Sequence, residues 1–205
     1  MDELDLLDWK RHVSELYARV RREPEPVAAW ELWRRERERL FREHPQSPVP
    51  ADERASYTGP HVFDYDPAWR LSAAVKSVAE QSFDLPSSDG GTMTMRRFAV
   101  ARAEGVELEL YWLEAYGGGM FVPFADATSG DETYGAGRYI LDTVKGADLG
   151  TSEGRLVLDF NFAYQPSCSY DSSWTCPLAP PANRLDVSIR AGERERRDSN
   201  PRPPA

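Results

Sequence analysis

The amino-acid sequence predicts an α+β fold that is mainly β, with an antiparallel β-sandwich or barrel-like core and an N-terminal pair of helices packed on it. Before residue 45 the apolar side chains recur every three or four residues, which is the spacing of one helix face. After residue 60 they follow the shorter runs of strands, separated by glycine-rich turns. No long helical pattern interrupts these strands, so we expect antiparallel neighbours.

The change of period also predicts how the 205 residues are organised. A chain of this length can bury one sizeable core. The last residues are polar and rich in proline and arginine, so they have little to bury against the entropy of ordering. We therefore expect a helical pair over 1–44, a connector over 45–60, a β-rich domain over 61–193 and a disordered tail over 194–205.

Two amphipathic helices are expected in the first segment. The first runs over about residues 5–22, with a buried stripe formed by Leu6, Trp9, Val13, Leu16 and Val20. Prolines at 24 and 26 end it and begin a second helix that reaches about residue 44. Arginines and glutamates alternate over 34–39, which predicts a solvated face. The apolar face of the second helix, which we expect to pack on the sheet, is Val27, Trp30, Trp33, Leu40 and Phe41.

Overall charge excludes some classes of protein. The net charge of −9 and pI of about 4.9 argue against nucleic-acid binding, which needs a concentrated basic face. The N-terminus is acidic where an export signal is basic, and no apolar run approaches the length of a spanning helix. We expect an acidic cytoplasmic protein that does not enter a membrane.

Strands are expected throughout the second segment. Turns are predicted at 87–91 and at Glu104-Gly105, where glycine permits positive φ. In the run after Gly105, the alternation predicts that Trp112 faces the core with Val106 and Leu108. The expected strands are 61–66, 69–78, 92–103, 106–115 and a run entered from the glycines at 117–119.

A first polar cluster lies over residues 124–140. Its short hydroxyl and carboxylate side chains and its glycines suit a loop that satisfies its own backbone. Arg138 is different, because at the entry to a strand it can clamp a carboxylate or phosphate, or simply pair with Asp126 or Asp159. Thr133 and Tyr134 belong to the same cluster.

A second polar cluster follows the apolar run 156–158. Asp159 and Asn161 are two residues apart and so share one face while the strand lasts. A buried carboxylate needs partners, which Asn161 or Arg138 can provide. Tyr164 follows at the strand end.

Cys168 and Cys176 allow three interpretations: buried small hydrophobes, a redox pair or disulfide, and a nucleophile or metal pair. A zinc site is not predicted, because the only histidines, at 12, 44 and 61, lie far upstream without close Cys-His spacing.

Six short blocks in the second half of the chain form a pattern. They are Phe124-x-Asp126-x-Thr128-x-Gly130, Thr133-Tyr134-x-x-Gly137-Arg138-Tyr139, Leu158-Asp159-Phe160-Asn161-x-Ala163-Tyr164-x-Pro166-x-Cys168, Cys176-Pro177-Leu178, Pro181-x-Asn183-Arg184-Leu185 and Ala191-Gly192-Glu193. In this order they resemble domain-of-unknown-function family 1684 of bacteria and archaea, over roughly residues 60–194. The resemblance implies no reaction, since that family is uncharacterised. Gln165 stands where the family usually has asparagine.

The leading functional hypothesis is a small-molecule or metabolite-binding β domain with a polar pocket at a strand end. The alternatives are a hydrolase using Asp159 as base, a thiol-dependent enzyme using Cys168, and a protein-interaction module. The sequence names no cofactor and no oligomeric state. The candidate ligand-binding residues are Asp126, Thr133, Tyr134, Arg138, Asp159, Asn161, Tyr164, Cys168, Cys176 and Asn183.

Overall fold

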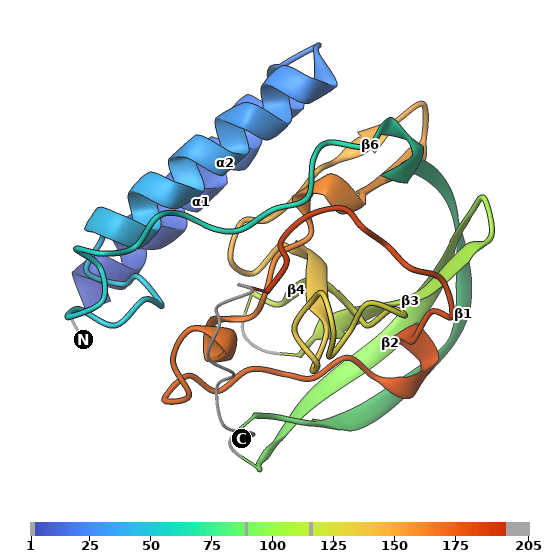
Figure 1. Cartoon of the computed structure of the whole chain (residues 1–205). Helices are drawn as coiled ribbons and strands as arrows, with labels where there is room; N and C mark the ends of the chain where they lie inside the picture. The colour runs from blue at the N-terminus through green and yellow to red at the C-terminus, as the bar shows by residue number, and fades with distance from the viewer. Residues whose placement is uncertain (1–2, 89, 115–116, 196–205) are drawn as a thin grey trace.

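The computed structural model describes residues 3–88, 90–114 and 117–195. Two helices, α1 (Glu3–Arg22) and α2 (Pro26–Glu43), lie side by side along one flank of a curled β-sheet (Figure 1). Both helices begin and end within about two residues of their predicted limits, because Pro24 and Pro26 separate them and Pro45 follows the second. No described helix is long and apolar enough to cross a membrane.

The described residues contain one seven-stranded sheet whose order is β5-β4-β3-β2-β1-β7-β6. Every neighbouring pair is antiparallel. The sheet curls into a half-barrel, so the predicted class, mainly β with N-terminal helices, is confirmed (Figure 1). The strands are β1 (Arg70–Pro86), β2 (Thr92–Ala103), β3 (Val106–Leu113), β4 (Gly119–Phe124), β5 (Arg138–Asp142), β6 (Thr151–Ser152) and β7 (Arg155–Asp159).

The prediction of a strand over 61–66 is wrong. That segment makes only an isolated bridge, between Val62 and Glu193. The Asp66 side chain then accepts a hydrogen bond from the Ala68 amide and caps a short 3-10 turn, which separates this segment from the sheet. Strand β1 begins at Arg70 and continues without a break to Pro86.

Strand β3 alternates as predicted at first and then changes face. Val106 and Leu108 are buried, but Tyr111 is only 1% exposed whereas Trp112 is 38% exposed. The prediction that Trp112 faces the core is therefore wrong. The reason is a bulge in the pairing of β2 with β3, where the register shifts between Arg97 and Ala99 and inverts the faces beyond it.

The helices and the sheet share one hydrophobic core. Its helical members include Leu16, Trp30 and Trp33, and the Trp33 ring packs edge-on against Phe162 at 5.6 Å between centroids. The helices thus pack on the sheet domain as expected. Leu6 and Val27 are exposed, contrary to the predicted stripes, because each lies near the start of its helix, outside the core.

The last described residues contact the segment that begins at His61 and the loop that contains Glu132. The Arg194 amide donates to the carbonyl of His61 at 2.9 Å, and the Glu195 amide donates to Glu132 at 2.9 Å. The first two residues of the predicted tail are therefore held by backbone hydrogen bonds. The remainder of that predicted tail, 196–205, lies outside the described residues.

Candidate functional site

Asp126, Thr133 and Arg138 lie together in one fully buried cluster. The Arg138 Nη2 is 3.3 Å from Asp126 Oδ1, and both side chains are inaccessible to solvent. The Thr128 hydroxyl lies 2.9 Å from that of Thr133 and donates to the same carboxylate. Of the two partners foreseen for Arg138, the structure therefore selects Asp126.

Arg138 also braces the C-terminal segment. Its guanidinium donates to the carbonyls of Ile189 at 2.9 Å and Glu193 at 3.0 Å, and to that of Ala191. Burial lowers the pKa of Arg138, although the Asp126 carboxylate opposes this shift. Within the Arg138 guanidinium, Nε is the one nitrogen that has no hydrogen-bond partner among the described residues. The polar groups of this cluster therefore bond to one another and to the backbone of residues 189–193, which they hold against the sheet.

Asp159 and Asn161 form a second closed cluster. The Asp159 carboxylate accepts hydrogen bonds from the amide and the side chain of Asn161, at 3.1 and 2.8 Å. Asn161 in turn pairs with the backbone N–H and carbonyl of Asp66, each at 2.9 Å. Burial raises the pKa of Asp159 to about 6, and the one cation beside it among the described residues, Arg70 at 3.4 Å, is half exposed. These groups hold the segment before β1, at Asp66, to the end of β7.

The Asn183 side chain forms a third group of structural hydrogen bonds. Its side-chain nitrogen donates to the carbonyls of Pro123 at 2.7 Å and Glu109 at 3.0 Å. Its oxygen accepts from the Glu109 amide at 2.8 Å. Both of its donor hydrogens and one acceptor direction of its oxygen are thus used between β3 and β4.

Cys168, Cys176 and Tyr134 make a separate group. Both cysteines are free thiols and both are buried. The Cys168 amide donates to the sulfur of Cys176 at 3.4 Å, and the Tyr134 hydroxyl lies 3.8 Å from the sulfur of Cys168. A hydrogen bond from Cys176 lowers the pKa of Cys168 to about 6, while the same contact raises that of Cys176.

A second buried arginine, Arg37 of α2, was not predicted, because its run was assigned to a solvated face. Its side chain is only 13% exposed and forms an ion pair with the fully buried Glu193. The Glu193 carboxylate also accepts from the Gln165 amide at 2.7 Å and from the Tyr170 hydroxyl at 3.2 Å. The sequence signal was the position of Arg37 four residues after Trp33 and four before Phe41, on the buried stripe.

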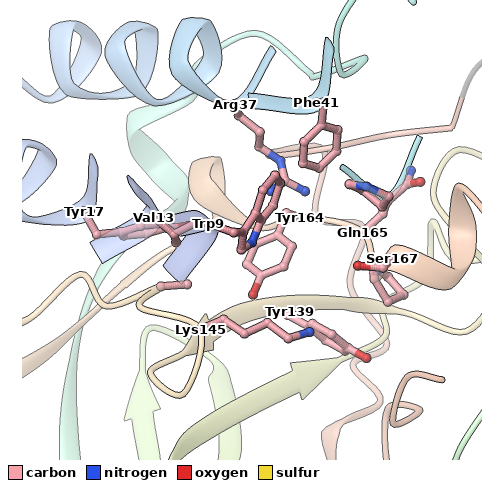
Figure 2. Close-up of a pocket in the computed structure, with 13 residues that line it drawn as sticks. Trp9, Val13, Tyr17, Arg37, Phe41, Tyr139, Lys145, Tyr164, Gln165 and Ser167 are labelled. Atoms are coloured by element: carbon pink, nitrogen blue, oxygen red, sulfur yellow. The ribbon is translucent and has the colours of Figure 1, made fainter. Parts of the chain in front are cut away.

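A small pocket opens beside this ion pair, between the helices and the β domain (Figure 2). Its volume is about 50 Å³. The Arg37 side chain extends from α2 toward the Tyr164 ring, with Trp9 in front and Lys145 on the opposite wall (Figure 2). Tyr164 is the one predicted site residue that lines it. The other lining residues are Trp9, Val13, Tyr17, Arg37, Phe41, Pro48, Tyr139, Lys145, Ala147, Gln165, Pro166 and Ser167.

Asp8, His12 and His44 also lie close together, with potential ligand atoms within 4.8 Å of one another. However, the Gln46 amide donates to His44 Nδ1 at 3.0 Å. A backbone N–H can only donate, so the proton of this ring sits on Nε2, 3.3 Å from Asp8. Metal-bound histidines donate from the second nitrogen instead. The geometry therefore fits a hydrogen-bonded helix contact better than a metal site.

The predicted site residues thus fall into separate groups, most with their polar atoms already bonded. Together, the fold and these clusters define a mainly β protein with an N-terminal helical pair and buried arginine–carboxylate pairs. A small pocket lies between the helices and the β domain. The chain belongs to the family described as "Protein of unknown function (DUF1684)", whose model matches residues 55–194.

A solved structure is also similar to this chain. It is the solution NMR structure of the uncharacterized protein from gene locus rrnAC0354 of Haloarcula marismortui, with 36% sequence identity and a TM-score of 0.55. The match covers 79% of this chain and 90% of that one. None of the curated proteins compared with the chain matches it.

Proposed function

We propose that this protein binds a small carboxylate-bearing molecule in the pocket between the helices and the β domain. The observation that supports this most is the arginine that lines the pocket. Arg37 uses Nε and Nη2 for Glu193, and no described residue accepts a hydrogen bond from its Nη1. A guanidinium with an open edge is a donor to carboxylates.

Aromatic rings hold that guanidinium in place. Its central carbon lies 4.3 Å from the Phe41 ring centroid and 4.7 Å from that of Tyr164. Burial alone would lower the pKa of Arg37, but the Glu193 carboxylate more than offsets this and raises it. The group therefore stays charged and oriented, which reduces the entropy lost when a ligand binds.

A second cation faces the same cavity. The Lys145 ammonium lies 3.8 Å from Asp142, whose pKa is raised by burial. Protonation of this carboxyl would leave Lys145 less compensated and the pocket positive. At about 10 to 15 Å³ for each water, the cavity of about 50 Å³ has room for a carboxylate group and little more.

The test is calorimetric titration of the whole chain with acetate, pyruvate and inorganic phosphate. We expect the carboxylates to bind and phosphate to bind more weakly. Lys145→Gln should weaken binding up to about fivefold, the range of a half-exposed ion pair. The matched control is Lys76→Gln, a lysine on the exposed part of β1, which should leave affinity unchanged. Absence of binding by both carboxylates, or equal losses in the two variants, contradicts the proposal.

The hydrolase hypothesis has less support. A general base must reach the proton that it abstracts. The Asp159 carboxylate is buried and already accepts two hydrogen bonds from Asn161, so we do not propose it as the base.

A further inference from the structure

We propose that Cys168 and Cys176 are a reversible dithiol–disulfide pair that reacts with hydroperoxides, with Cys168 as the nucleophile and Cys176 as the resolving thiol. This inference does not depend on the carboxylate site.

The two sulfurs are placed for a bond. The sulfur of Cys176 is 3.4 Å from the amide nitrogen of Cys168, and therefore less than about 5 Å from the attached Cα. The two thiols are also hydrogen-bonded to each other. The sulfurs are therefore already in contact, and a rotation of the side chains can bring them to the bond length of about 2.05 Å. Ser88 fixes the backbone of Cys176 by donating to its carbonyl and accepting from its amide, both at 2.9 Å. The pair is thus a defined arrangement.

The surroundings distinguish the two thiols. Cys168 is 8% exposed and Cys176 only 1% exposed, so a small oxidant meets Cys168 first. Burial raises the pKa of Tyr134, which keeps its proton and can donate to the Cys168 sulfur at 3.8 Å. Cys176 and the side chain of Ser88 are further donors to that sulfur. All three donors favour the thiolate at Cys168, the form that attacks oxidants.

The first step is attack of the Cys168 thiolate on the terminal oxygen of a hydroperoxide, ROOH. A sulfur–oxygen bond forms, the oxygen–oxygen bond breaks, and the alkoxide leaves and takes a proton from solvent. The sulfur loses two electrons and becomes a sulfenic acid, while the peroxide is reduced to an alcohol.

In the second step Cys176 loses its proton and attacks the sulfur of Cys168. The sulfur–oxygen bond breaks, and hydroxide leaves with that proton as water. The contact that chiefly raises the pKa of Cys176 is the one with Cys168. Oxidation of Cys168 to the sulfenic acid removes the negative charge of its thiolate, so the pKa of Cys176 falls. Cys176 therefore becomes a nucleophile only after Cys168 has reacted.

The chain contains only these two cysteines, which makes the experiment direct. The reduced full chain is treated with hydrogen peroxide, alkylated under denaturing conditions and weighed intact. We expect loss of two hydrogens, no alkylation and no covalent dimer. In Cys176→Ser, dimedone should trap a sulfenic acid at position 168. In Cys168→Ser, oxidation should slow by about tenfold or more.

Several outcomes would overturn the proposal. They are two alkylatable thiols after peroxide treatment, a disulfide between chains, and unchanged oxidation of Cys168→Ser. Circular dichroism establishes that each variant is folded. As a separate readout, Tyr134→Phe should move the pH midpoint of Cys168 alkylation upward. An unchanged midpoint would remove Tyr134 from the arrangement and, with it, the assignment of Cys168 as the activated thiol.

Discussion

Two buried arginines hold the same C-terminal segment and differ in whether a hydrogen-bond donor remains available to a ligand. Arg138 lies at the start of β5 and gives its hydrogens to Asp126 and to the carbonyls of residues 189, 191 and 193. Arg37 lies on α2 and reaches the side chain of Glu193. The first guanidinium is enclosed by protein. The second belongs to a residue that lines a pocket, and its Nη1 has no acceptor among the described residues.

This difference separates a structural brace from a candidate binding group. A buried cation whose two Nη groups are taken by a carboxylate and by backbone carbonyls can stabilise a segment but has little to offer a ligand. A cation that is held by one carboxylate and stacked between rings is positioned and still has a donor available. Both residues are arginines largely removed from solvent, so residue type alone does not identify function.

The largest expected effect concerns removal of each charge. Arg138→Met leaves Asp126 without its cation inside the core and should cost about 3–5 kcal/mol of unfolding free energy. The Asp126 and Glu193 carboxylates each keep at least two other donors, so the difference comes from solvent. Arg37→Met should cost less, because Arg37 lines the pocket and water can enter there. Urea unfolding measures both, with the exposed Arg102→Met as a control near wild type. Equal losses at 37 and 138 would erase the distinction between the two arginines.

The fold could be predicted because its signals are local. Helix spacing, the prolines between α1 and α2, and the glycine turns at 87–91 and at 104–105 all lie within short stretches of sequence. The face of Trp112 could not be predicted in the same way, since it depends on a bulge in the pairing with a neighbouring strand.

The candidate site was less predictable for a related reason. Arg138, Asp159 and Asn183 were named as candidate ligand-binding residues, and in the structure all three are buried. Which bonds they make depends on segments far away, such as Asp66 for Asn161 and Ile189 for Arg138. The pocket joins residues from helices and loops that no sequence spacing relates.

A second prediction tests the segment on which both arginines converge. Gly192 has a φ of +78°, and a Cβ there would lie 2.4 Å from the Ala163 carbonyl oxygen. Gly154 has a similar φ of +75° but open space around it. Both alanine variants pay about 1–2 kcal/mol for the left-handed backbone. Gly192→Ala should lose about 1–3 kcal/mol more from the clash.

Thermal and urea unfolding of the two glycine variants measure this difference. The clash should also displace Glu193, so Gly192→Ala should weaken acetate binding at the pocket while Gly154→Ala should not. Equal stability of the two variants would show that the close approach of this segment is not what fixes Glu193 beneath Arg37.

The smallest effect concerns Asp159, a buried carboxylate whose arginine partner, Arg70, is half exposed. Its pKa is raised from 3.8 to about 6 by burial, so between these values the folded protein binds more protons than the unfolded chain. Stability should therefore fall as pH rises through this window, by at most about 1.4 kcal/mol per pH unit. Asp159→Asn keeps an acceptor for the Asn161 amide but cannot titrate.

The measurement is the difference in unfolding free energy between wild type and Asp159→Asn from pH 4 upward. The unfolding free energy of the variant relative to that of wild type should rise until about pH 6. Above that pH the difference between the two should stay constant. Arg70→Gln removes the half-exposed cation that lowers the Asp159 pKa, so in that background the gain should continue to higher pH. A difference that does not change with pH would mean that Asp159 is as well compensated as Asp126 and Glu193, although its only cation lies at the surface.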